Sequence, residues 1–166
     1  MDRYYYLISS LPLLKFAERP SLTKQDFISE SEKWLSGQDL GILSKADINN
    51  FIKEKGDTSV LRKYKEFEYI LREELVFYRT ARKKNVEYKI RRDLDQILKE
   101  INNPLEIEKQ ILLLRWNFLE EEELEHFFDL DFLIIYNLKL QILERLFIFD
   151  KKKGKERFEL FSKVES

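Results

Sequence analysis

The longest part of this chain contains almost none of the residues that make a polypeptide turn. Residues 57–153 include no glycine and a single proline, Pro104, and the glycines of the protein stand at positions 37, 41, 56 and 154. Barrels, sandwiches and doubly wound sheets need frequent turns, which glycine and proline supply. The sequence therefore predicts an all-α fold, in which short connections make the long helices antiparallel neighbours.

The composition supports a packed core and excludes several classes of function. The 166 residues include 13 Phe, 8 Tyr and 2 Trp, enough aromatic surface for a real interior. Lys and Arg number 30 against 31 Asp and Glu, so the global charge gives no argument for nucleic acid or an anionic membrane. The absence of Cys excludes disulfides, thiolate metal sites and Cys nucleophiles.

Two apolar segments bear on localisation. Tyr4–Leu14 is interrupted by serines and a proline and lacks the small-residue cleavage site of a signal peptide, so we expect a structural helix. Phe132–Leu138 is the longest other uncharged run, far short of the ~20 residues that span a bilayer. We expect a cytoplasmic protein with no direct membrane insertion, peripheral to a membrane only through a larger complex.

Capping signals predict a first short helix after the N-terminal segment. Thr23 and Asp26 have the spacing of a capping box, and Gly37 is a natural stop. The apolar stripe of this helix would comprise Phe27, Ser31, Trp34 and Leu35.

The same spacing recurs at Ser44 and Asp47, and it predicts a further helix that ends at Gly56. Residues 40–43, between the two, are expected to form one helical turn. The apolar face of the further helix would comprise Ile48, Phe51 and Ile52.

Residues 60–101 contain no helix breaker and predict either one long helix or two helices joined near Asn85. The sequence Asn102-Asn103-Pro104 is the clearest boundary in the chain. The positions with helical 3–4 spacing in the first part of this segment are Leu61, Tyr64, Glu68, Leu71, Leu75, Tyr78 and Arg82.

Beyond this boundary we expect one helix from Leu105 and another from Asp131 to about Lys163, which Gly154 would interrupt. The apolar face of the last helix would comprise Leu133, Tyr136, Leu140, Leu143, Phe147 and Phe158. The whole chain is expected to form one domain, with a short-helix lobe over residues 1–57 and a long-helix lobe over residues 58–166.

The single histidine, His126, is the chain's best candidate metal ligand. Glu123 precedes it at the spacing used in di-iron carboxylate bundles, but such a site needs two of these motifs, and a zinc site of the His-Glu-x-x-His type needs a second histidine. A Mg²⁺-dependent hydrolase built on carboxylates around Glu122–His126 remains an alternative. We expect a solvated helix end, with no metal and no cofactor.

The chain also lacks the two commonest local signatures of enzyme chemistry. No Gly-x-Ser-x-Gly nucleophile elbow occurs, and the glycine of the Lys151–Lys155 stretch does not have the spacing of a phosphate-binding loop. We therefore expect no catalytic residues and a protein that is not an enzyme.

Charged residues are segregated into three blocks. Residues 79–92 contain one acid, residues 120–131 contain no Lys or Arg, and residues 151–157 are again basic. We expect these blocks either to pair inside the fold or to bind a partner, and their near-cancellation favours a protein partner. Tyr78 and Tyr88 beside the first block leave RNA or DNA binding as the alternative. The candidate partner-binding residues are Arg79, Arg82, Lys83, Lys84, Arg91, Arg92, Glu120, Glu121, Glu122 and Glu123.

Both ends of the chain resemble an uncharacterised family of small bacterial proteins encoded among the subunits of V-type (V/A-type) ATPases. The resemblance covers residues 4–14 and 105–161, and the middle of the chain carries no matching motif. Leu146 follows the last string where relatives tend to have an aromatic residue. The matching strings are YYYLISSLP (residues 4–12), LRW (114–116) leading to FDLD (128–131), and YNLKLQILER (136–145) followed by Gly154 and Phe158.

The resemblance implies a non-catalytic component or assembly factor of a rotary ATPase. In such ATPases a helical cap joins the central stalk to the membrane ring, and we call this component the stalk cap. Because the stalk cap is itself all helical, a role like that of the stalk cap is our leading expectation. It rests on analogy and not on a site. The expected partners are V-type ATPase subunits, most of all those of the central stalk, and no nucleic acid.

Overall fold

The computed structural model describes the backbone of residues 2–87 and 89–165, and the side chains of residues 3–87, 89–149 and 151. The described chain is helical, without strands, so the predicted all-α class is confirmed. Tyr88, Phe158, Lys163 and most of the basic block 151–157 lie outside the described side chains. In chain order the helices are α1 (Asp2–Ser10), α2 (Lys24–Glu32), α3 (Gly37–Lys45), α4 (Ser59–Lys84), α5 (Arg92–Glu100), α6 (Pro104–Glu123) and α7 (Leu130–Glu165).

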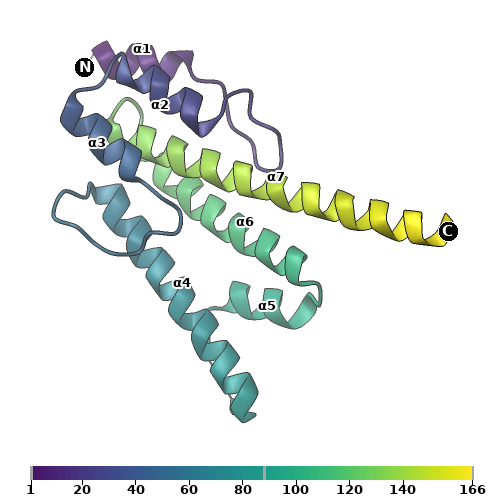
Figure 1. The fold of residues 1–166 in the computed structure, drawn as a ribbon. Coiled ribbons are helices and arrows are strands. Elements are labelled where there is room, and N and C mark those ends of the chain that lie inside the picture. Colours follow the sequence, from purple (N-terminus) through teal and green to yellow (C-terminus); the bar gives the residue numbers. More distant parts are fainter. Residues whose placement is uncertain (1, 88, 166) are drawn as a thin grey trace.

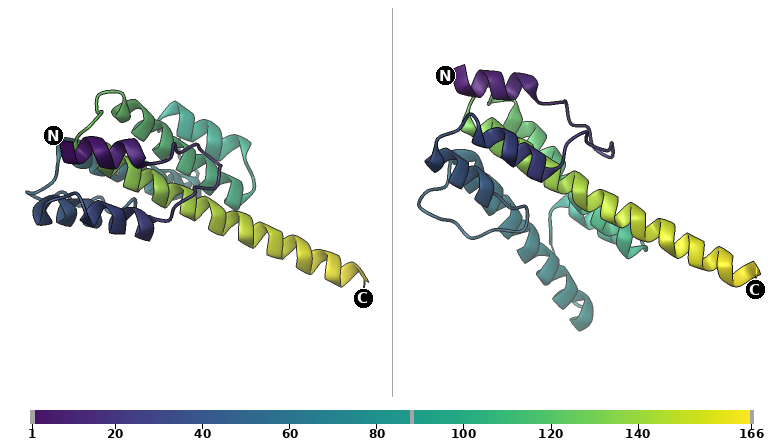
Figure 2. Two further views of the ribbon diagram at one scale, coloured as in Figure 1. Left: turned by 90° about the horizontal axis from the view of Figure 1, so that it is seen from above. Right: turned by 45° about the horizontal axis from the view of Figure 1, so that its top comes forward.

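Helix α7 is the centre of the fold. It packs against α2 and α3 on one side and against α4 and α6 on another, while its second half extends beyond the other helices (Figures 1 and 2). Its first half is buried nearly all round, from Leu133 to Leu143. A helix that is apolar on every side must lie inside a fold, which explains why this segment is central.

The interior consists of two clusters of buried side chains. The larger one joins Leu7, Phe27 and Leu43 of the short helices to the first half of α7, so residues on both sides of position 57 share one core. The smaller cluster, called here the second core, centres on Leu71 of α4 and includes one fully buried side chain of α5, Leu94. The α5 helix therefore rests on a separate and smaller core.

Local signals explain where the helices begin and end. Thr23 and Asp26 form the predicted capping box, each accepting a hydrogen bond from the other's backbone N–H. Asn103 caps α6, whose first residue is Pro104. Asn85 ends α4 with a φ of 55°, a left-handed conformation that asparagine tolerates. Residues 60–101 thus form two helices, and the break lies at Asn85.

The predicted helix after Ser44 is absent, because residues 46–58 form a loop. Ser44 lies inside α3 and donates to the carbonyl of Leu40. Asp47 and Asn50 accept hydrogen bonds from backbone N–H groups two residues on, in the Asx turns that compete with a helix.

Other side chains bind the polar backbone atoms of this loop. Gln141 of α7 donates to the carbonyl of Ala46 and accepts from the N–H of Ile48, and the hydroxyl of Tyr64 donates to the carbonyl of Ile48. These bonds satisfy the buried backbone without a helix.

Two further expectations about glycines are also wrong. Gly37, expected to stop a helix, is the first residue of α3, which has nine residues instead of the single turn expected over residues 40–43. The hydroxyl of Ser36 caps this helix through the N–H of Asp39. Gly154 lies within α7 without interrupting it, although helices normally disfavour glycine.

The described helices include none with the length and apolar character that a crossing of the bilayer requires.

Candidate functional site: a basic groove between three helices

The largest cavity in the described part of the chain lies where the second half of α4 diverges from α6, with α5 in the angle between them (Figure 1). This groove has a volume of about 900 Å³. Its floor is apolar and half-exposed, because these side chains rest with one side on the second core or beside it. The floor residues are Leu75, Leu98, Ile101 and Ile107.

The rim of the groove is mainly basic. Arg79, Arg82 and Lys83 of α4 are exposed along one edge, and Lys99 of α5 lines another. Glu108 is the only acidic residue among the lining side chains. The groove therefore combines an apolar floor with an excess of positive charge.

The three cations of α4 have no carboxylate within ion-pair distance among the side chains that the structure describes. Lys99 differs, because its ammonium lies 3.1 Å from the carboxylate of Asp95. The positive charge at Arg79, Arg82 and Lys83 is thus available to a ligand.

The other predicted residues of the basic block do not line the groove. Arg91 binds the carboxylate of Asp93 at 2.7 and 2.8 Å, and its guanidinium lies over the ring of Phe67. Lys84 and Arg92 are exposed away from it. The structure brings three of the six predicted basic residues together at one site.

The predicted acidic residues lie at the opposite end of α6. Glu120 and Glu123 bind the ammonium of Lys139 at 2.9 and 2.6 Å, and Glu122 pairs with Lys63 at 3.4 Å. Glu121 is exposed. The alternative that this block pairs inside the fold with residues 79–92 is therefore wrong: α4 and α6 run antiparallel, which places the two blocks at opposite ends.

Lys139 is a buried cation that sequence reasoning missed. Its side chain is 4% exposed, and its ammonium also lies 4.9 Å from the ring centre of Trp116. A lysine in an apolar helical run signals a buried ion pair only when its partners are known, and these come from a different helix.

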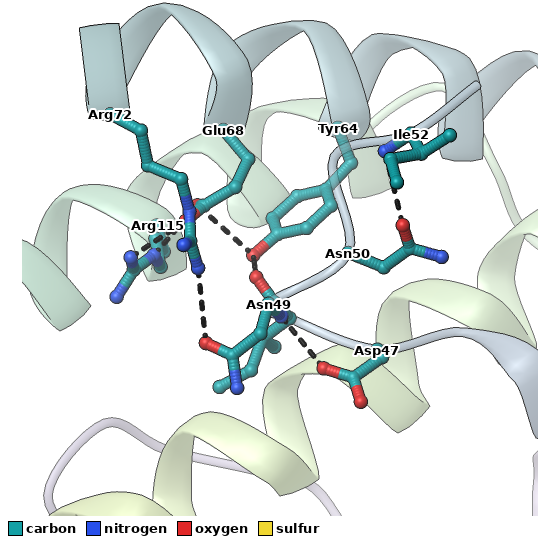
Figure 3. A network of polar contacts seen from close by, with 9 residues as sticks. Asp47, Asn49, Asn50, Ile52, Tyr64, Glu68, Arg72 and Arg115 are labelled. Carbon is teal, nitrogen blue, oxygen red and sulfur yellow. Dashed lines mark hydrogen bonds and ion pairs between the residues drawn. The ribbon is translucent and has the colours of Figure 1, made fainter.

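A second missed feature is a buried carboxylate between α4 and α6 (Figure 3). Glu68 is fully buried, and it accepts hydrogen bonds from Arg115 of α6 and from Arg72 one turn further along α4, each at 2.8 Å. Arg72 also reaches Asn49 in the 46–58 loop at 3.3 Å. These bonds fix α4 against α6 on the N-terminal side of the groove.

The pKa shifts in this network follow from its burial. Burial, followed by the charge of Glu68, raises the pKa of Tyr64 well above its ordinary value. Burial alone would lower the pKa of Arg115, but its hydrogen bonds to Glu68 and the charge of that carboxylate raise it overall. Both groups therefore keep their protons near neutral pH, as the network requires.

The surroundings of His126 differ from the expected Glu123–His126 pairing. Glu123 is bound to Lys139, whereas the Nδ1 atom of His126 lies 2.8 Å from Asp129. Ligand atoms of Glu122, Glu125 and His126 lie within 4.8 Å of one another. Since one ring nitrogen already faces Asp129, only the other would be left for a metal, and exposed acidic groups of this kind are common without one.

A smaller cavity of about 340 Å³ lies between α3 and the 46–58 loop. The buried ammonium of Lys65 lines it but binds both oxygens of Asp57 at 2.9 Å. This mutual neutralisation makes the cavity a weaker candidate than the basic groove.

The fold and the groove together define an all-helical protein with a surface suited to binding. The chain belongs to the family described as "Protein of unknown function (DUF2764)", whose model matches residues 73–165. The matched segment contains every residue that lines the groove. No curated protein matches the chain, and no solved structure does.

Proposed function

We propose that this protein is a non-catalytic component that acts by docking to another protein, and that the basic groove is its docking surface. The observation that carries the proposal is the coincidence of a half-exposed apolar floor with the exposed cations Arg79, Arg82 and Lys83. Apolar area supplies affinity in protein interfaces, and charge supplies orientation and rate.

We further propose that the partner belongs to a V-type ATPase, with the soluble subunits of the central stalk as the first candidates. The support is the resemblance of residues 4–14 and 105–161 to proteins encoded with such ATPases. An elongated helical body whose last helix extends beyond the core is compatible with a role like that of the stalk cap. The protein would then be peripheral to the membrane through the complex.

A nucleic-acid-binding role for residues 79–92 is the alternative, and the position of Tyr78 weighs against it. RNA-binding sites commonly stack bases on exposed aromatic rings. Tyr78 is only 8% exposed and packs inward, so the groove offers cations without a stacking surface. This combination favours a protein partner.

The test is co-purification from cells that express the ATPase. The tagged full-length protein is recovered at low salt, and V-type ATPase stalk subunits are expected with it. Their yield should fall as salt rises, because the Debye length shrinks to about 3 Å at 1 M. Recovery of no ATPase component contradicts the proposal, and recovery of RNA in its place supports the alternative.

A further inference from the structure

We infer that the basic groove binds an amphipathic helix of its partner that carries Asp or Glu beside its apolar face. This inference rests on the proposed docking function and specifies the chemistry of the docked segment. Three observations carry it: the apolar floor, the row of cations on α4, and the arrangement of the helices that form the walls.

The floor fits the apolar face of a helix. Leu75, Leu98 and Ile107 each pack on the second core with one side and remain partly exposed on the other. A helix laid in a groove presents apolar residues at positions i, i+3, i+4 and i+7, which form a continuous stripe. Such a stripe would cover the exposed side of all three residues at once.

The charges on α4 select acidic side chains. Arg79, Arg82 and Lys83 are spaced three and four residues apart, so they are neighbours on one face of the helix. Acidic residues at the same spacing on the docked helix would face this row. Opposite charges at the rim steer association and fix orientation, whereas the apolar contact provides most of the affinity.

The shape of the site favours a helix over a small molecule. Binding pockets for small molecules enclose most of the ligand surface. In this groove the floor is half-exposed and the three α4 cations lie open to solvent, between walls contributed by α4, α5 and α6. A site that is open along its length suits a segment of a larger partner.

The experiment measures binding of labelled helical peptides to the full-length protein by fluorescence anisotropy. The acidic set has four 18-residue peptides, each with Leu at helical spacing flanked by Glu, and the apolar register is shifted from one peptide to the next. One control set replaces every Glu by Lys, and a second replaces every Leu by Ser. We expect saturable binding of at least one acidic peptide and none of either control set.

Paired variants locate the binding site. R82E/K83E should weaken binding of the acidic peptide about tenfold or more, whereas R62E/K55E, which makes the same charge change at exposed positions outside the groove, should leave it within about twofold. Ile101→Ala removes floor area at a residue that lies outside the second core, and Ile148→Ala is its exposed control on α7. Only the former should weaken binding.

Several results would overturn the inference. They are the absence of saturable binding by all four acidic peptides, equal binding of the Lys-substituted set, and equal effects of R82E/K83E and R62E/K55E. Preferential binding of a single-stranded RNA oligonucleotide would reassign the groove to nucleic acid. Self-association of the chain that R82E/K83E abolishes would reassign it to a second copy.

The outcome is separable from that of the proposed function. If acidic peptides bind in the groove but no ATPase component is recovered, the chemistry of the groove stands and the ATPase partner is wrong. If ATPase components are recovered with R82E/K83E as well as with the natural protein, the partner stands and the groove is not its docking site.

Discussion

Arg115 and Glu68 form a two-point ion pair between α6 and α4, with both nitrogen–oxygen distances at 2.8 Å. The carboxylate is fully buried, and the guanidinium side chain is 11% exposed. Two charges removed from water in this way depend on each other, because either one alone would be buried without compensation. The pair therefore holds the two helices in one relative position.

Glu68→Gln should lower the free energy of unfolding by about 3–5 kcal/mol, because Arg115 would keep its charge and lose its partner. Urea denaturation followed by circular dichroism measures the change. Glu66→Gln, at an exposed position of the same helix, is the control and should cost less than about 0.5 kcal/mol. Equal effects of the two variants would show that the pair does not hold α4 to α6.

Leu140 and Leu143, predicted from the sequence as core residues of the last long helix, are fully buried in α7. Replacement of either by Ala should cost about 2–5 kcal/mol, since a cavity forms inside the larger core. Thermal or urea unfolding measures the loss. Ile148→Ala lies on the exposed part of the same helix and should change stability by less than about 0.5 kcal/mol.

The pKa of Tyr64 predicts a stability that falls in alkali. Burial and the charge of Glu68 raise this pKa well above its ordinary value of 10, so the contribution is complete below pH 10 and is lost as pH rises through the folded-state pKa. The natural protein should therefore lose up to about 1.4 kcal/mol per pH unit more than Tyr64→Phe in that range. Urea midpoints between about pH 9 and 12 test this, and parallel curves would contradict it.

Charge reversal of Arg82, Lys83 and Lys84 to Glu should affect binding far more than folding. These residues do not face Glu120–Glu123, so the expected loss of stability is about 1–2 kcal/mol, from unfavourable charge at the C-terminus of α4. Association with the partner should slow at least about tenfold at low salt. Stopped-flow association rates of the folded protein, compared at low and high salt, separate the two effects.

His126→Ala should cost about 0.5–1.5 kcal/mol, the value of one lost hydrogen bond to Asp129. Protein purified without chelator should contain no stoichiometric Zn²⁺, Mn²⁺ or Fe²⁺ by mass spectrometry of the metals. A bound metal that disappears in this variant would instead support the hydrolase alternative around Glu122–His126.

The sequence predicted the helices whose signals are local. The capping box at Thr23, the break near Asn85 and the boundary at Pro104 all depend on residues within a few positions. The loop after Ser44 was missed because Gln141 and Tyr64 satisfy its backbone from distant helices.

The candidate site was predictable only in part, for the same reason. Charge segregation identified Arg79, Arg82 and Lys83, which are adjacent in sequence. The floor residues come from three helices, and the way α4 diverges from α6 depends on packing that no local pattern records. Glu68 followed the helical spacing, but its burial could not be read without its partner Arg115.

The division of the interior into two clusters separates recognition from durability. The first half of α7 and the short helices supply the larger core, whereas one wall of the groove, α5, has a single buried side chain, Leu94, as its anchor. Such a weakly anchored element opens at a lower free energy than the whole molecule. Substitutions in the second core can therefore reshape the groove while the larger core keeps the protein folded, and relatives can change partners without rebuilding the fold.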